Sequence, residues 1–256
     1  DKFKWNIVPA SYGYSNITSN QVNQDFLAEY VGITVKQDGS EDFTTIQQAI
    51  NASVSGDDVI VHAGRYYENI YFNGKNIVLR STNPQDPNVV AATVIDANGS
   101  GTVVTFSGSE TFVCKLEGFI ITGGSASDGG GIYGNSTRAV IIDCIIIGNS
   151  ARNATISRGG GLYNFDGTIR NCTITGNSAG SYGGGLSNCD GTIQNCTIAN
   201  NSASGGGGGL DRCHGVIQSC TITGNSASSG GGLYICDETI LNCIISNNTA
   251  HSGGGL

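Results

Sequence analysis

A glycine-rich tetrad recurs along the second half of this chain at a nearly constant spacing. Three consecutive glycines are followed by leucine or isoleucine six times, and the intervals between them are 30, 24, 24, 23 and 23 residues. The triplets begin at Gly129, Gly159, Gly183, Gly207, Gly230 and Gly253. A fixed period of this size is typical of a solenoid, in which one coil cannot bury its apolar face alone. The period therefore predicts the fold before any single residue is considered.

Each later repeat also carries a cysteine within a run where apolar and polar residues alternate. The runs are TIRNCTIT, TIQNCTIA, VIQSCTIT and TILNCIIS, at residues 168–175, 192–199, 216–223 and 239–246. Alternation is the strand period, and Gly, Asn, Ser and Asp lie between the runs, where turns are needed. We predict about three short strands per coil, stacked on the next coil as parallel strands about 4.8 Å apart. The predicted fold is therefore all-β, a parallel β-helix.

Stacked coils place equivalent residues in columns along the axis. Inward apolar columns are expected to start at Leu162, Ile169 and Ile174 and to continue through every later coil. The turn residues Asn177, Asn201, Asn225 and Asn248 are expected to bond through their amides from coil to coil. Asparagine in such a turn also tolerates the left-handed backbone region. Residues 151–158 lengthen one coil and are predicted to form a surface loop.

The nine cysteines follow the same period. Cys144, Cys172, Cys196, Cys220 and Cys243 make one column, and Cys189, Cys213 and Cys236 continue a column that starts at Phe165. A position shared with phenylalanine is a core position, so these thiols are expected to be buried and inert. Vertical disulfides between neighbouring coils are the alternative. Metal ligation is disfavoured because the sequence has no CxxC or Cys/His spacing.

Composition limits the classes of partner. Charged residues make up 12% of the 256 residues, about half the share of an ordinary globular domain. The net charge of −8 disfavours nucleic acid as a partner, and no apolar run is long enough to predict a membrane span. The chain contains no methionine, even at position 1, so we expect it to be processed, trimmed or a fragment.

The solenoid is predicted to occupy residues 31–256, with regular coils over about 129–256. Phe43, Ile46 and Ile50 have helical spacing behind the acidic Asp42, which predicts a short capping helix over about residues 42–53. Such a helix would cover the open end of the core. Residues 57–64, 68–72 and 75–80 are predicted as strands of the first coil. Strands of the next coil are expected within 93–97, 102–106 and 114–122.

Three segments near the start carry a resemblance to known proteins. DGSEDFTTIQQAI at residues 38–50, GDDVIV at 56–61 and KNIVLR at 75–80 resemble the opening of pectin methylesterases and other pectate-lyase-like right-handed β-helix proteins. The later ITGNSASSGGGLY, residues 222–234, is similar to repeats of polymorphic outer-membrane proteins. Together the resemblances cover about residues 33–256 and imply a right-handed parallel β-helix. They imply no single activity, because this fold hosts both enzymes and adhesins.

The two ends of the chain suggest a mode of assembly. Residues 1–30 fall outside the repeat and are predicted to be a β-strand segment, either the remnant of a sandwich-like domain or a donor-strand extension. Residues 252–256 begin another coil with no polar cap behind it. We therefore expect either a fragment of a longer repeat protein or a head-to-tail fibre, in which residues 1–30 add strands to a neighbour's open end.

One polar column is the candidate site. Asp166, Asp190, His214 and Asp237 occupy the same turn of successive coils, so their side chains should stack about 5 Å apart. Solvated turn residues are the simplest interpretation. Calcium bridging Asp166, Asp190 and Asp237 is the second, because calcium takes several oxygen ligands. Glycoside hydrolysis by a carboxylate pair is the third, although these residues obey the repeat and a catalytic set should break it.

The leading functional hypothesis is a non-catalytic extracellular structural or adhesion module of a bacterial surface or fibre-forming protein, without a cofactor. Its expected partners are further copies of itself, neighbouring domains of a longer chain, or a cell-surface polysaccharide. The alternative is a calcium-dependent β-helix protein that binds or cleaves polysaccharide, as a lyase or glycoside hydrolase. A minor alternative is ice binding by the outward threonines Thr173, Thr175, Thr197, Thr221 and Thr223, although Ala199, Ile244 and Ser246 interrupt those columns.

Overall fold

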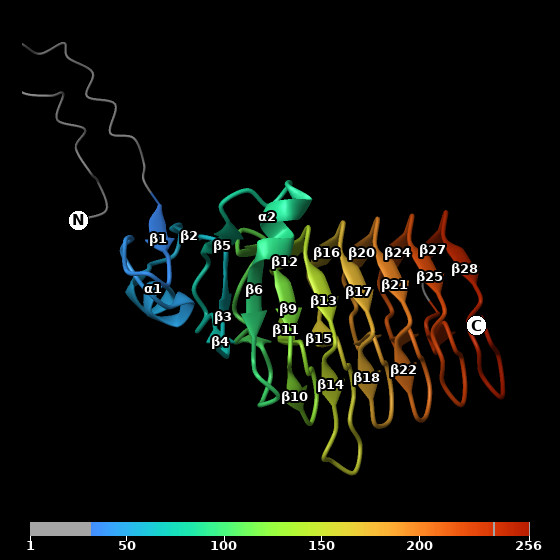
Figure 1. Cartoon of the computed structure of the whole chain (residues 1–256). Helices are drawn as coiled ribbons and strands as arrows, with labels where there is room; N and C mark the ends of the chain where they lie inside the picture. The colour runs from blue at the N-terminus through green and yellow to red at the C-terminus, as the bar shows by residue number, and fades with distance from the viewer. Residues whose placement is uncertain (1–31, 238, 256) are drawn as a thin grey trace, which may run out of the picture.

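The computed structural model describes residues 32–237 and 239–255, which form a stack of coils along one axis (Figure 1). Every pairing between named strands is parallel, and each strand pairs with its equivalents in the preceding and following coils. The predicted all-β parallel β-helix is confirmed. The hypotheses about residues 1–30 concern a segment outside the described residues.

Three long sheets and one short sheet make the walls of the solenoid. Sheet A consists of β1 (Ile33–Val35), β2 (Asp58–Val61), β5 (Val78–Ser81), β8 (Lys115–Glu117), β12 (Val140–Ile142), β16 (Thr168–Arg170), β20 (Thr192–Gln194), β24 (Val216–Gln218) and β27 (Ile240–Leu241). Sheet B consists of β3 (Gly64–Tyr66), β6 (Thr93–Asp96), β9 (Ile120–Thr122), β13 (Ile145–Ile147), β17 (Thr173–Thr175), β21 (Thr197–Ala199), β25 (Thr221–Thr223) and β28 (Ile244–Ser246).

Sheet C and the short sheet D complete each coil. Sheet C consists of β4 (Ile70–Tyr71), β7 (Val104–Thr105), β11 (Ile132–Thr137), β15 (Leu162–Phe165), β19 (Leu186–Ser187), β23 (Leu210–Asp211) and β26 (Leu233–Tyr234). Sheet D consists of β10 (Ser125–Ala126), β14 (Ser150–Ala151), β18 (Ser178–Ala179) and β22 (Ser202–Ala203). The predicted loop of residues 151–158 leaves the stack after β14, with residues 152–156 exposed.

The strand register puts the predicted apolar columns inside. Ile169 pairs with Ile193, Ile174 with Ile198, and Leu162 with Leu186. All six side chains are buried in one continuous core. In-register parallel stacking lets one strand sequence serve every coil, because each side chain packs on a copy of itself.

The asparagine column bonds as predicted, and its members before Asn248 are almost inaccessible to solvent. Asn201 Nδ2 donates to Ile174 O at 2.9 Å and to Asn225 Oδ1 at 3.0 Å. Asn201 Oδ1 in turn accepts from the backbone N and the Nδ2 of Asn177, at 3.0 and 3.1 Å. The same bonds extend back to Asn149 and forward to Asn248. These amides satisfy backbone groups that the turn would otherwise bury without partners.

Left-handed backbone is found elsewhere than expected. The described residues with positive φ include Asn171 (56°), Asn195 (54°) and Asn242 (53°), which lie in the turns between sheets A and B, but none of the buried asparagine column. The asparagines of the buried column instead serve through their amide hydrogen bonds. Asparagine occupies both kinds of position, so the sequence alone does not distinguish amide bonding from left-handed backbone.

All nine cysteines lie among the described residues as free thiols, so the vertical disulfides are not formed. Seven are buried, and Cys236 and Cys243 are half-buried near the end of the stack. Burial raises the pKa of Cys114 to about 12, which leaves little of the reactive thiolate at neutral pH. The predicted inert core cysteines are consistent with this burial.

The thiols supply a first prediction. Titration of the folded chain with a thiol reagent at neutral pH should show rapid reaction of at most Cys236 and Cys243, because the other seven thiols are buried. All nine should react in denaturant. Rapid reaction of more than two thiols in the folded chain would mean that the core opens readily.

The capping helix is present but shorter than predicted. Helix α1 spans Ile46–Ala52 rather than about 42–53, with Thr45 as its N-cap. The Glu68 carboxylate accepts from the backbone N–H groups of Ile46 and Gln47, at 2.8 and 2.9 Å, so the helix begins where these donors are satisfied. Ile46, Ala49 and Ile50 are buried against the first coil. The helix therefore covers the end of the core, as expected.

A second helix, α2 (Pro87–Ala92), was not predicted. The Asp86 carboxylate caps it by accepting from Asn88 N at 2.9 Å, and Pro87 occupies its first turn. Helix α2 contacts β6 and β9 of sheet B and projects at the upper edge of the stack in Figure 1.

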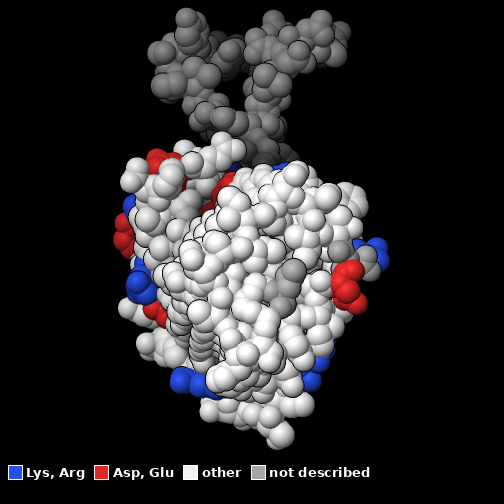
Figure 2. Space-filling model, turned by 90° about the vertical axis from the view of Figure 1, so that its right-hand side faces the viewer, with Lys and Arg blue, Asp and Glu red and all other residues white. Residues whose placement is uncertain are grey.

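The surface carries few charges. Viewed from the C-terminal end, most of the molecule is neither acidic nor basic, and the charged side chains lie around the rim (Figure 2). Among the described residues, no helix is long and apolar enough to cross a membrane.

Candidate functional site

The sequence-predicted column of Asp166, Asp190, His214 and Asp237 makes contacts mostly among its own members. His214 Nδ1 lies 2.5 Å from Asp237 Oδ1, and the backbone N–H of His214 donates to Asp190 Oδ1 at 3.0 Å. Asp190 and Asp237 are exposed, whereas Asp166 and His214 are half-buried. The structure thus joins three of the four residues, at the turn between sheets C and A.

Calcium binding at this column stays a prediction. Within residues 32–237 and 239–255, no three His, Cys, Asp or Glu side chains gather closely enough to hold a metal ion. The contacts of His214 with Asp190 and Asp237 explain the column as a ladder of turn residues.

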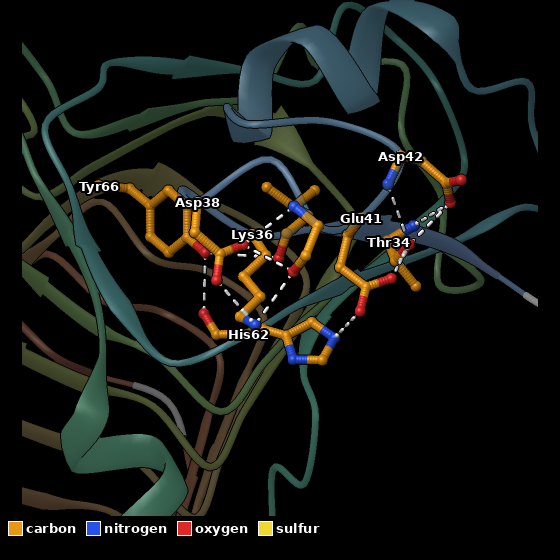
Figure 3. Close-up of polar contacts among 9 residues, drawn as sticks. Thr34, Lys36, Asp38, Glu41, Asp42, His62 and Tyr66 are labelled. Atoms are coloured by element: carbon orange, nitrogen blue, oxygen red, sulfur yellow. Dashed lines mark hydrogen bonds and ion pairs between the residues drawn. The ribbon is translucent and has the colours of Figure 1, made fainter.

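A second polar cluster surrounds the turn that leads into α1 (Figure 3). The Thr34 hydroxyl lies 3.0 Å from Glu41 Oε2 and 2.7 Å from Asp42 Oδ2, and His62 Nε2 lies 3.6 Å from Glu41 Oε1. Nearby, the Lys36 ammonium and the Ser40 donors hold the pKa of Asp38 well below its usual range. These contacts tie β1 to the turn and to β2, so they explain the cluster as support for the cap.

A groove lies between the α2 segment and sheet B, with a cavity of about 360 Å³. One wall is apolar and comes from the α2 segment, through Pro84, Pro87 and Val90. The opposite side comes from two successive coils, and it is formed by Asp143, Cys144, Ile145, Asn171 and Thr173. Gln85 completes the lining. A cavity of this size is at the lower end of the range of small-molecule sites, roughly 300–1,000 Å³.

A glycine lets the α2 segment form this wall. Gly118 stacks on Asp143, because the preceding residues Glu117 and Ile142 pair in sheet A. A Cβ at Gly118 would lie 2.5 Å from Pro84 Cα. Its φ of +74° also favours glycine. Gly118, Asp143 and Asn171 occupy the same turn position in successive coils. Gly118 has no side chain and Pro84 lies against it, so the polar side chains of this turn column begin at the groove with Asp143 and Asn171.

The polar side of the groove has a regular arrangement. Asn171 Nδ2 donates to Asp143 Oδ1 at 3.0 Å. The same turn column continues beyond the cavity through Asn195, Ser219 and Asn242, and beside it the outward threonine column runs through Thr173, Thr197 and Thr221. Amide and hydroxyl groups therefore repeat along the axis at the spacing of parallel strands, about 4.8 Å. Of these residues, Asn171 and Thr173 line the cavity opposite the α2 wall, whereas Ser219 and Thr221 lie outside it.

The sequence does not predict the groove, although one residue of its lining, Thr173, belongs to the predicted ice-binding columns. The signal for the wall was the string Asp86-Pro87, a capping residue followed by the residue favoured in a first helical turn. The sequence of this six-residue helix does not predict that it packs against sheet B.

Comparison with known proteins supports the fold at the level of families. Residues 130–256 match the family model described as "Right handed beta helix region". The chain is a right-handed parallel β-helix repeat protein. No curated protein matches the sequence.

Solved structures show the same β-helix fold over most of the described chain. A pectin methylesterase from Aspergillus niger, in a penultimately deglycosylated form, is 17% identical with a TM-score of 0.55, covering 83% of this chain and 75% of that one. The deglycosylated form of the pectin methylesterase from the same organism is 15% identical with a TM-score of 0.53, covering 83% and 85%. Likeness at this identity shows the fold alone.

Proposed function

We propose that this chain is a non-catalytic extracellular surface module that binds an extended polysaccharide in the groove between α2 and sheet B. The observation that carries the proposal is the cavity of about 360 Å³, which has one apolar wall and one wall of repeating amide and hydroxyl groups. The low share of charged residues, 12%, and the β-helix fold shared with pectin methylesterases support a role with carbohydrate outside the cell.

The two walls suit the two kinds of surface on a sugar ring. A pyranose presents C–H groups on its faces and hydroxyl groups at its edge. Pro84, Pro87 and Val90 offer apolar contact to the faces, while Asp143, Asn171 and Thr173 offer donors and acceptors to the edge. Such a set binds hydroxyl groups. Of the described residues that line the cavity, Asp143 alone carries a carboxylate, and its Oδ1 is engaged by Asn171.

The chain offers a matched pair of variants that tests the groove. Asn171→Gly with Thr173→Val removes an amide and a hydroxyl from the cavity. Ser219→Gly with Thr221→Val removes two hydroxyl groups at the equivalent positions two coils further along the same columns, outside the cavity. Gly accepts the positive φ at both turn positions, 56° at Asn171 and 55° at Ser219, so both variants should fold.

The groove variant should bind polysaccharide about 10-fold more weakly than the unaltered chain, because two hydrogen bonds contribute about 1.4 kcal/mol or more together. The control variant should bind within about twofold of the unaltered chain. Affinity electrophoresis through gels that contain a β-glucan, a xylan or a polygalacturonate measures both, with and without a calcium chelator. Equal weakening of the two variants would place the ligand elsewhere, and no retardation in any gel would contradict the proposal.

A further inference from the structure

A second site is suggested where an outward column of sheet C departs from the repeat. The residue after each core leucine or isoleucine is Tyr133, Tyr163, Ser187, Asp211 and Tyr234 in successive coils. The aromatic rings of Tyr133 and Tyr163 contact each other, with centroids 5.7 Å apart. Ser187 and Asp211 replace two rings, and we call this interruption of the tyrosine column between Tyr163 and Tyr234 the notch. Asp211 at its floor is 0% exposed.

The Asp211 carboxylate is only half satisfied. Its Oδ2 accepts from Ser187 Oγ at 2.9 Å and lies 3.2 Å from Arg212 Nη1. Its Oδ1 is buried and has no partner among the described residues. Burial raises the pKa of Asp211 against the opposing effects of Ser187, Arg212 and Arg158. An unpartnered carboxylate oxygen in a buried position costs free energy, and nothing in the architecture of the coil requires it.

Arg212 covers this carboxylate and is itself out of pattern. It occupies the position of Asn164 and Asn188 in the preceding coils and shares their left-handed backbone, with φ of 46°. Its guanidinium lies 5.1 Å from the centroid of the Tyr182 ring. The side chain is 38% exposed. A positive charge therefore rests between an aromatic face and a buried carboxylate, and solvent reaches it from outside.

The walls of the notch come from neighbouring columns. Tyr182 pairs with Arg158 on one side and with Gly206 on the other. A Cβ at Gly206 would lie 2.4 Å from Tyr234 Cδ1, so the absence of a side chain there admits the Tyr234 ring. Arg158 Nη1 donates to the Tyr163 hydroxyl at 3.4 Å, and the Arg158 charge also acts on the Asp211 carboxylate. The notch thus has a carboxylate floor, a serine hydroxyl and walls from Tyr182 and Tyr234. Two cations, Arg158 and Arg212, act on the carboxylate, and Arg212 contacts it.

We propose that Ser187, Asp211 and Tyr182 form a binding site for a primary ammonium group, and that Arg212 occupies this site in the free chain. A ligand reaches Asp211 only when the Arg212 side chain moves aside. A neutral ligand would then leave the buried carboxylate without the counter-charge that contacts it, which is costly. An ammonium group replaces the charge and contacts the Tyr182 face. An ammonium group has three N–H donors, whereas Arg212 contacts Asp211 Oδ2 through Nη1. One of the three donors can therefore bond Asp211 Oδ1.

This site is distinct from the groove beside α2 and does not depend on the proposed function. An ammonium group of this kind occurs on an amino sugar and on a lysine side chain. Glucosamine and Nα-acetyl-lysine amide represent the two sources. N-acetylglucosamine and the Nε-acetylated lysine derivative are their uncharged counterparts.

The decisive variant is Arg212→Asn, which restores the asparagine of the preceding coils and suits the positive φ at this position. Removing the internal competitor should tighten binding of the free amines at least about 10-fold over the unaltered chain, because the empty site is then always available. Addition of amine should also raise the melting temperature of this variant. Asp211→Asn, and the double variant with Arg212→Asn, should bind neither amine.

Titration calorimetry and thermal melting measure these effects. Binding of glucosamine alone would assign the site to amino sugars, and equal binding of both amines would assign it to the ammonium group in general; both outcomes support the inference. The inference is overturned if the acetylated compounds bind equally well, if Arg212→Asn fails to tighten binding, if Asp211→Asn retains it, or if neither amine binds Arg212→Asn.

Discussion

Asn201→Asp is expected to lower the free energy of unfolding by about 4 kcal/mol or more at neutral pH. The substitution keeps the shape of the side chain but replaces Nδ2 with an oxygen. That oxygen would face Ile174 O at 2.9 Å and Asn225 Oδ1 at 3.0 Å, where two donated hydrogen bonds stood. Asn201 is 1% exposed, so water cannot compensate. Two lost donors and a buried negative charge act together.

The same coil contains a matched control on its surface. Asn195 has a positive φ of 54°, which aspartate tolerates, and its side chain is exposed. Asn195→Asp should change the free energy of unfolding by no more than about 0.5 kcal/mol. Urea unfolding of both variants compares them directly. A similar loss in both would show that the buried column contributes little beyond the charge change.

The pH dependence of Asn201→Asp separates charge from shape. The introduced carboxyl is buried beside two acceptors, so its folded pKa should be raised above its unfolded value. The native state of this variant then binds the extra proton more readily, and the defect should shrink as the pH falls through the folded pKa. A defect that does not change between neutral and acidic pH would assign the loss to packing.

The repeat made most of the fold predictable. Ile174, Asn201 and Cys196 could each be placed from the sequence, because in-register stacking turns a period into a column and the columns into a core. The handedness came from a resemblance and the cap from the helical spacing of Phe43, Ile46 and Ile50, and the cap helix begins at Ile46 rather than at residue 42. Its start depends on Glu68, which lies far along the chain and reaches the helix only after folding.

The candidate sites were less predictable, for two physical reasons. The groove requires Pro84 to pack on Gly118, a contact between segments with no shared pattern. The notch could be predicted from the sequence, because Asp211 breaks the column of Tyr163 and Arg212 breaks the column of Asn164. The predicted site column, which includes Asp190 and His214, instead obeys the repeat. In a solenoid the residues that break a column are the better candidates for binding, since the fold does not need them.

Gly184→Ala is the second substitution expected to have a large effect, about 3 kcal/mol or more of destabilisation. A Cβ at Gly184 would lie 2.4 Å from Ser202 O and 2.5 Å from Gly208 O. Both are backbone oxygens of the next coil, and Gly184 N itself donates to Gly207 O at 3.0 Å. The next coil therefore cannot move aside without breaking the hydrogen bonds that join the coils.

Gly180→Ala, four residues earlier in the same coil, is the matched control. The nearest atom to a Cβ there is Ser157 Cβ at 3.4 Å, an ordinary contact, and φ lies outside the left-handed region. This change should be neutral or stabilise the chain by about 0.4–1 kcal/mol, because alanine restricts the unfolded state. Thermal and urea unfolding of the two variants measure the difference. Equal stability would mean that the glycine triplets reflect something other than the close approach of successive coils, and the steric account of the tetrad would have to be abandoned.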